Sequence, residues 1–245
     1  MEVKFIDKMG TDLSVVNAAR VSFSKTSDWV YEVVEEVDAD SRTLMSYKMP
    51  KDLQDKDKKL INFLAKNNHW TPFAHTSITL HLKVPIFVAR QLHKHQVGGV
   101  VNEVSRRYID SEPEFYFPEN WRKRNEDKKQ GSHEDQFVKK IEVNSVPWYP
   151  SPWHPTAAAK LYCNNMLLLY KDMLKTGVCP EQARMLLPQN MYTEFYWTGS
   201  LVFFARVFGL RAKPDAQLET RHVANLIDHI CAKHFPISWA ALTNK

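Results

Sequence analysis

The chain has 245 residues, of which 44% are hydrophobic and 25% charged, and its formal net charge at pH 7 is +5. These values are typical of a soluble globular protein. The modest positive charge suits an anionic ligand better than duplex nucleic acid, which calls for a concentrated basic stripe. No apolar run is long enough to cross a bilayer. We therefore expect a protein that binds neither membrane nor nucleic acid, with a non-catalytic nucleic-acid-binding protein as the rival class.

Cysteine and glycine usage exclude several kinds of site. The 3 cysteines form no CxxC pair, so neither a disulfide framework nor a thiolate zinc site is indicated, and we expect a cytoplasmic protein without a metal site. No GxGxxG or GxxxxGK[ST] motif occurs, which excludes a Rossmann turn or a P-loop as the means of binding a dinucleotide. Cys179 precedes Pro180 at a predicted helix start, a position that favours a thiolate.

The first quarter of the chain shows three predicted elements and one irregular stretch. A short strand is expected over residues 3–6, followed by a helix capped by Thr11 or Asp12. Residues 24–50 show no sustained period and are expected to form an irregular excursion. Apolar residues at helical spacing then predict a helix over residues 53–66.

The rest of the chain mixes helices and strands. Alternating apolar and polar residues predict a strand with one buried face over residues 78–82, and the mixed charges of residues 119–142 indicate solvated surface. Arg206 interrupts an apolar helix, and because a buried unpaired charge is costly, a carboxylate or phosphate should lie beside it. No domain boundary is visible, so residues 1–245 are expected to form one domain. The other expected elements are an extended connector over residues 147–155, helices over 156–177, 180–188, 201–210 and from 214 onward, and a strand over 192–197.

The most polar stretch runs from Arg90 to Tyr108 and combines cations, imidazoles, a carboxylate and a hydroxyl. A helix is predicted from residue 86 to about 97, which places Gln91 and His95 on one face, and the two glycines that follow should end it. The loop beyond sets guanidinium groups beside a hydroxyl, a combination that suits a phosphate monoester. An amphipathic helix followed by a solvated charged loop is the alternative that this stretch leaves open.

Seven short sequence motifs are spread through nearly the whole chain. They are residues 17–23 (NAARVSF), 69–75 (HWTPFAH), 85–91 (PIFVARQ), 102–108 (NEVSRRY), 183–188 (ARMLLP), 197–201 (WTGSL) and 210–219 (LRAKPDAQLE). In this order and spacing they resemble the flavin-dependent thymidylate synthases, a family unrelated to the synthases that use a cysteine nucleophile. One such motif would be a weak signal, whereas the ordered set is specific.

The sequence departs from that family's signature in one place. The signature is Arg-His-Arg, then seven residues, then a serine within an Asn-Glu-x-Ser-x-Arg run. Here the triplet is Lys94-His95-Gln96, and the gap before Ser105 is one residue longer. Lys94 keeps a charge without the guanidinium fork, and Gln96 carries no charge. The departure bears on how flavin and folate are held and indicates a sibling reaction as the alternative.

The resemblance implies a fold and an activity. The fold is α+β, with a mixed or antiparallel sheet, long helices and no Rossmann unit. The activity is FAD-dependent methylation of dUMP to dTMP, with methylenetetrahydrofolate as carbon donor and NADPH as reductant, in a homotetramer whose sites form between subunits. The alternative is flavin- and folate-dependent hydroxymethylation of a pyrimidine deoxynucleotide on the same scaffold. The family needs no enzyme thiol, so Cys179 is not expected to be catalytic.

The resemblance also implies roles for the residues at matching positions. It implies that dUMP is held by Gln91, Glu103, Ser105, Arg106, Arg107, Arg184 and Arg211, with Ser105 and Arg107 at the phosphate. It implies that FAD and folate are bordered by His69, Thr71, Lys94, His95, Gln96, Val97, Ser200 and Arg206. Arg184, Arg211 and His95 are the residues expected to take part in the chemistry.

Overall fold

The computed structural model describes residues 1–37, 44–109, 111–126, 131–143 and 152–244. The chain divides into two compact units and passes between them several times, so neither unit is a continuous segment. Unit 1 comprises Met1–Lys4, Leu80–Trp197 and Leu210–Leu226, and unit 2 comprises Phe5–Thr79, Thr198–Gly209 and Ile227–Lys245. One domain over residues 1–245 stays a prediction.

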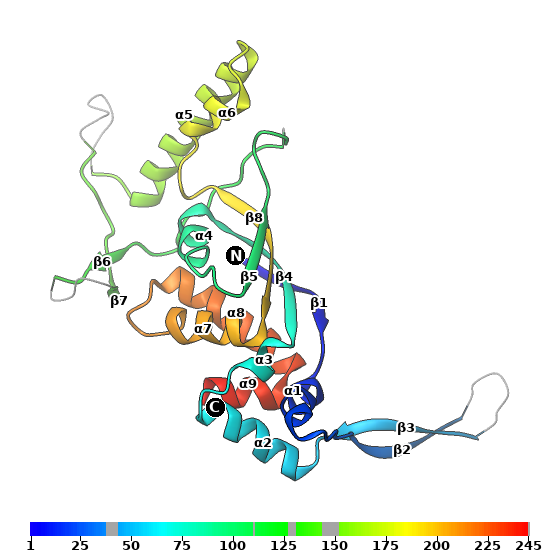
Figure 1. Ribbon diagram of the computed structural model, residues 1–245. Coiled ribbons are helices and arrows are strands. Elements are labelled where there is room, and N and C mark those ends of the chain that lie inside the picture. The colour runs from blue at the N-terminus through cyan, green and yellow to red at the C-terminus, as the bar shows by residue number, and fades with distance from the viewer. Residues whose placement is uncertain (38–43, 110, 127–130, 144–151, 245) are drawn as a thin grey trace. The chain divides into compact units, whose positions relative to one another are not determined.

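Four strands pair in the order β1-β4-β8-β5 (Figure 1). They are β1 (Glu2–Met9), β4 (Ser77–Pro85), β8 (Tyr192–Ser200) and β5 (Gly99–Glu103). The central strands β4 and β8 bury alternate residues, as expected of strands with one face against a core. The strand predicted over residues 78–82 is therefore confirmed.

Helices and short strand pairs make up the rest of the fold, which confirms the predicted α+β class. The helices are α1 (Asp12–Arg20), α2 (Asp55–Lys66), α3 (Thr71–Ala74), α4 (Ile86–Leu92), α5 (Pro155–Lys175), α6 (Pro180–Ala183), α7 (Leu201–Arg211), α8 (Leu218–His234) and α9 (Pro236–Thr243), with 3-10 turns at Val21–Phe23 and Arg184–Leu186. No helix among the described residues is both long and apolar enough to span a membrane.

The irregular excursion predicted over residues 24–50 is wrong. β2 (Val30–Val37) and β3 (Leu44–Asp52) form an antiparallel pair that extends away from α1 and α2 of the same unit (Figure 1). Nearly every residue of this pair is exposed on both faces. Because neither face is buried, the sequence shows no alternation of apolar and polar residues, and the pattern on which the prediction relied is missing.

The helix predicted to reach residue 97 ends at Leu92 instead. Residues 94, 96 and 97 are exposed, so no burial of an apolar face stabilises a further turn. Gly98 adopts a φ of +90°, a left-handed conformation that costs glycine little. The chain then enters β5, where the sequence had predicted a loop.

The charged region and the last long helix also differ from their predictions. β6 (Arg122–Arg124) and β7 (Ser132–Phe137) pair antiparallel within the region expected to be solvated surface, and the Arg122 side chain is only 16% exposed. The helix expected from residue 214 begins at Leu218. Residues 144–151, most of the predicted connector, lie outside the described part of the chain.

The core of unit 2 joins its first helices to its last. A cluster of buried apolar side chains from α1, α2, α3, α7 and the segment that joins β3 to α2 forms its centre: Val15, Val16, Leu53, Ile61, Leu64, Phe73 and Val202. Beside it, Asp12 is 3% exposed, and its carboxylate accepts hydrogen bonds from the backbone N–H groups of Ile237 at 3.2 Å and Ser238 at 2.8 Å. Asp12 thus caps the N-terminus of α9, where the helix dipole favours a negative charge.

Replacing this buried carboxylate should destabilise unit 2. We expect Asp12→Ala to lower the free energy of unfolding by about 2–3 kcal/mol, because one buried and one partly buried N–H group lose a charged acceptor. Chemical denaturation measures the change, and the exposed Asp55 of α2 provides the matched control, Asp55→Ala. Equal stabilities of the two variants would contradict the capping role.

Candidate active site

Two segments far apart in the sequence meet at Arg211, the last residue of α7. Its Nε donates a hydrogen bond to Nε2 of His95 at 2.9 Å, and its Nη2 donates to the backbone oxygen of Gln91 at 2.8 Å. A ring nitrogen that accepts a hydrogen bond carries no proton, so His95 is neutral with its proton on Nδ1. Burial lowers the pKa of His95, and the charge of Arg211 lowers it further. The structure therefore brings together three of the predicted site residues.

A chain of hydrogen bonds leads from Gln91 to the start of α8. The Nε2 of Gln91 donates to Oε1 of Gln217, and its Oε1 accepts from the hydroxyl of Thr220 at 3.1 Å. Gln217 donates in turn to Oε2 of Glu219 at 3.0 Å. Sequence reasoning missed these partners, although Gln217 and Glu219 belong to the last stretch that carries the family resemblance.

The chain of hydrogen bonds ends in a buried ion pair. Two nitrogens of the Arg122 guanidinium lie 2.9 Å from the two carboxylate oxygens of Glu219, whose side chain is 7% exposed. The third, Nε, donates to Ser132 at 2.7 Å. Burial alone would raise the pKa of Glu219, but hydrogen bonds from Arg122 and Gln217 and the charge of Arg122 outweigh it, so this pKa lies below its ordinary value. Glu219 is therefore a carboxylate at neutral pH.

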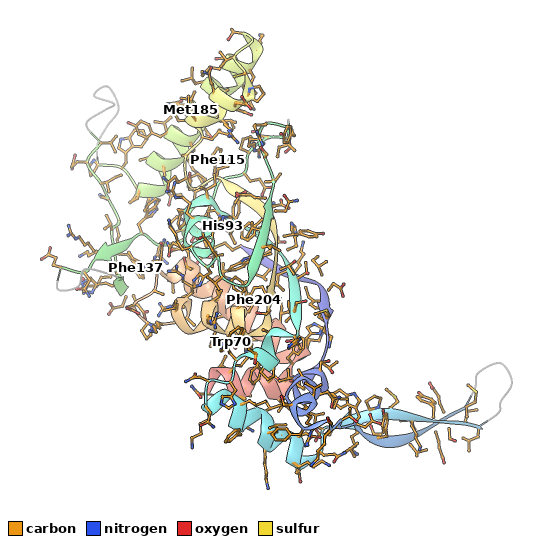
Figure 2. All side chains as sticks on the ribbon, viewed as in Figure 1. Trp70, His93, Phe115, Phe137, Met185 and Phe204 are labelled. Carbon is orange, nitrogen blue, oxygen red and sulfur yellow. The ribbon has the colours of Figure 1, made fainter. Side chains whose placement is uncertain are left out.

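A cavity of about 480 Å³ lies beside this network, within the range of small-molecule sites. Its polar lining includes Gln91, Arg122, Ser132, Glu134, Arg211 and Gln217. A larger cavity of about 1180 Å³ shares Arg122, Glu134 and Leu218 with it, and its aromatic lining includes Phe115 and Phe137 (Figure 2).

The other predicted nucleotide residues lie on an exposed arc of unit 1. Arg107 donates from Nε to the hydroxyl of Ser105 at 3.1 Å, and its guanidinium lies 4.9 Å above the Tyr108 ring. Its Nη1 is 3.7 Å from the carboxylate of Glu181, in an exposed ion pair. An exposed pair at this distance contributes little to stability, so this guanidinium is available to another anion.

Glu103 and its neighbours connect this arc to the sheet. The carboxylate of Glu103 accepts a hydrogen bond from Thr193 at 2.6 Å and lies 3.9 Å from Nδ1 of His93. Burial lowers the pKa of His93. The guanidinium of Arg106 donates to a backbone oxygen nearby, and Arg184 is exposed at the start of a 3-10 turn. The cavity that Gln91 and Arg211 line is not lined by Ser105, Arg107 or Arg184.

Three further predicted residues, Lys94, Gln96 and Val97, are exposed in unit 1, and the other four lie in unit 2. Arg206 is exposed, and its guanidinium lies 5.8 Å from the centre of the Trp70 ring (Figure 2). Because an exposed guanidinium remains hydrated, the fold itself does not require an anion beside Arg206, and the carboxylate or phosphate expected there stays a prediction. Thr71 is exposed at the first position of α3, next to Trp70 in sequence. His69 packs against Phe63, and the hydroxyl of Ser200 accepts from the backbone N–H of Phe203 at 3.3 Å.

The neutral state of His95 predicts a pH dependence. A pKa lowered from 6.5 means that the unfolded chain binds the proton more tightly than the folded chain. The contribution of neutral His95 to the stability of the folded protein is therefore fully present above pH 6.5. It is lost as the pH falls through the lowered pKa of His95 in the folded protein. We expect the thermal midpoint to fall less steeply below pH 6.5 in His95→Asn than in the parent protein. Parallel profiles would show that burial and the charge of Arg211 do not hold His95 neutral in the folded protein.

Comparison with known proteins identifies the family. The model described as thymidylate synthase complementing protein matches residues 4–237. A flavin-dependent thymidylate synthase from Thermus thermophilus is 33% identical over 246 residues, an alignment that covers 98% of this chain and 74% of the relative. One from Thermosipho africanus is 33% identical over 241 residues, covering 98% of this chain and 89% of the relative.

A solved structure supports the same assignment. The UMP/dUMP methylase PolB from Streptomyces cacaoi, bound with 5-Br dUMP, matches with a TM-score of 0.72 and 25% identity, covering 99% of this chain and 94% of that chain. The family expected from the seven stretches is thus confirmed. The chain belongs to the thymidylate synthase complementing protein family, which includes the flavin-dependent thymidylate synthases.

Proposed function

We propose that this protein is a flavin-dependent enzyme that methylates dUMP to dTMP, with methylenetetrahydrofolate as carbon donor and NADPH as reductant. The observation that carries the proposal is the family match over residues 4–237. The relatives that cover nearly the whole chain are named flavin-dependent thymidylate synthases, and the structural relative binds a dUMP analogue. These names and this complex support a pyrimidine nucleoside monophosphate as the substrate.

The phosphate of dUMP is assigned to Ser105 and Arg107, with Arg106 beside them. The Arg107 guanidinium is exposed and only loosely paired with Glu181 at 3.7 Å, so an incoming phosphate can replace that carboxylate at little cost. The Ser105 hydroxyl lies 3.1 Å from the same guanidinium. A fork and a hydroxyl at this distance can donate to neighbouring oxygens of one phosphate.

The uracil ring is assigned to Arg211, Gln91 and Arg184, with Glu103 nearby. Forming a carbon bond at C5 requires electron density from the ring, so negative charge grows on a carbonyl oxygen. Two guanidinium nitrogens of Arg211 are already engaged with His95 and Gln91, which leaves Nη1 to donate to that oxygen. A donor fixed before the reaction stabilises developing charge without reorganisation, an effect commonly worth about 3 kcal/mol.

The predicted flavin residues have the chemistry that FAD requires. A diphosphate needs cations and hydroxyl donors, and the flat rings need apolar contacts. Unit 2 offers Thr71 and Arg206 beside the half-exposed Trp70, and unit 1 offers Lys94, His95, Gln96 and the 79% exposed Val97. His69 and Ser200 complete the proposed group in unit 2. FAD would supply hydride chemistry that side chains cannot provide.

Exposed apolar side chains support a homotetramer with sites formed between subunits. Val97, Val100 and Tyr108 are 79%, 69% and 76% exposed on the segment that also carries Ser105 and Arg107. Met185, next to Arg184, is 75% exposed (Figure 2). Large apolar side chains gathered around charged groups are typical of surfaces that another protein covers. A second copy that covers this segment would bring its own donors to the nucleotide.

The alternative product is a hydroxymethyl nucleotide. Lys94 and Gln96 replace two arginines of the family signature and are exposed, so two fewer guanidinium forks are available to flavin and folate. Lys94 and Gln96 lie in the segment expected to hold flavin and folate. Their difference from the family signature is the one observation that favours hydroxymethylation. We retain methylation as the proposal because the named relatives carry it.

Two measurements on the purified protein test the proposal together. We expect a flavin absorption spectrum, either as isolated or after reconstitution with FAD, and conversion of dUMP to a product of the mass of dTMP. A product heavier by one oxygen would select hydroxymethylation instead. Protein that cannot be reconstituted with FAD would contradict both reactions.

Removing the Arg107 guanidinium should weaken nucleotide binding strongly without unfolding the protein. We expect Arg107→Ala to weaken dUMP binding roughly a hundredfold, because two charge-assisted hydrogen bonds are lost. Calorimetric titration measures the affinity, and circular dichroism checks the fold. The exposed Arg124 of β6 gives the matched control, Arg124→Ala. Unchanged dUMP affinity in Arg107→Ala would remove this residue from the site.

A further inference from the structure

The start of α8 contacts Gln91 through residues to which the family resemblance gives no role. We propose that Gln217, Glu219 and Thr220 are positioning residues that hold the side-chain amide of Gln91 in one orientation at the nucleotide site. The inference rests on the proposed function, because it assumes that Gln91 contacts dUMP. These three residues are buried or half-buried, and they are distinct from Ser105 and Arg107, to which the phosphate is assigned.

The carboxylate of Glu219, which is paired with Arg122, sets the donor and acceptor direction of the hydrogen bonds that lead through Gln217 to Gln91. An ionised carboxylate only accepts hydrogen bonds, so Gln217 must turn its NH₂ group toward Glu219. This turns Oε1 of Gln217 toward Gln91, and Gln91 must therefore present its own NH₂ group. Each amide is left with one allowed orientation, although an isolated glutamine has two of nearly equal energy.

Thr220 fixes the other end of the same amide. Its hydroxyl is fully buried and donates its single hydrogen to Oε1 of Gln91 at 3.1 Å. Gln91 is thus held from both sides, by a donor at its oxygen and by an acceptor at its nitrogen. One N–H and one lone pair remain on the Gln91 amide. Both Gln91 and Gln217 line the cavity of about 480 Å³, so these free groups define the pattern available to a ligand.

A flipped Gln91 would present the opposite pattern. The oxygen and nitrogen of the amide would exchange places, and a uracil edge that matches one arrangement would meet like groups in the other. An amide free to flip therefore binds dUMP less tightly even when its backbone does not move. Positioning of this kind affects the affinity for dUMP through Gln91 alone, which distinguishes it from a general loss of stability.

The test measures dUMP affinity of FAD-loaded protein by calorimetry. We expect Gln217→Met, which keeps the length and removes the amide, to weaken dUMP binding by about tenfold, the effect of one lost hydrogen bond. Thr220→Val should weaken it similarly, and Thr220→Ser, which restores the hydroxyl, should rescue it. Glu219→Gln should also weaken it, but it leaves the partly buried Arg122 without a charged partner. If that variant does not fold, Gln217→Met and Thr220→Val decide between the outcomes.

A double-mutant cycle separates positioning from structure. If Gln217 acts through Gln91, then adding Gln217→Met to Gln91→Ala changes the dUMP affinity by less than about twofold. Additive effects would overturn the inference, as would unchanged affinity in both Gln217→Met and Thr220→Val. Glu112→Gln is the matched control for Glu219→Gln, because Glu112 forms an exposed ion pair with Lys171 at 2.9 Å, and it should bind dUMP as the parent protein does.

The parent protein distinguishes the two levels of the account. If it does not bind dUMP, the proposed function fails and the inference fails with it. If it binds dUMP and all the variants bind equally well, the proposed function stands and only the positioning role is overturned. If the variants lose affinity in the pattern given above, Gln217 and Thr220 act on the nucleotide through Gln91.

Discussion

The ion pair between Arg122 and Glu219 is the contact on which the organisation of unit 1 depends. Removing both charges from water costs several kcal/mol per ion, and their attraction repays that cost only when further hydrogen bonds satisfy the remaining polar atoms. Here the guanidinium reaches both carboxylate oxygens and Ser132, and the carboxylate also accepts from Gln217. The pair joins β6 to the first turn of α8. Through Gln217 it also sets the orientation of the hydrogen bond between the start of α8 and Gln91 of α4.

The proposed nucleotide residues fall into a fixed group and an exposed group. Gln91, His95 and Arg211 form hydrogen bonds with one another or with α8, so their positions are set before any ligand arrives. Ser105 and Arg107 lie on an exposed arc with large apolar neighbours. This division suits a site in which one part holds the reacting ring rigidly and the other is completed by a second copy of the chain.

The sequence predicted the parts of the fold that depend on local signals. β4 and β8 show alternation because one face is buried, and α5 ends just before Gly177, which adopts a φ of +93°. The β2–β3 pair was missed because both of its faces are exposed, and the end of α4 was misplaced because glycines further on gave the more visible stop signal.

The site was predicted less from the residues than from the family resemblance. No local pattern marks Arg122, which stands in a run of mixed charges and finds Glu219 at a separation of 97 residues. A contact over such a distance depends on the complete fold, so sequence spacing cannot reveal it. Gln217 and Glu219 belong to one of the stretches that carry the family resemblance, but their role follows only from the hydrogen bonds that join Glu219 to Gln217 and Gln217 to Gln91.

A crystal structure of the assembled protein with FAD and dUMP would show whether the fixed and the exposed groups of residues bind the same nucleotide. We expect one nucleotide whose phosphate contacts Ser105 and Arg107 while its ring contacts Gln91 and Arg211, with these residues contributed by more than one subunit. The flavin should lie beside Lys94, His95 and Val97. A nucleotide bound elsewhere, or these residues scattered with no common cleft in the assembly, would contradict this expectation.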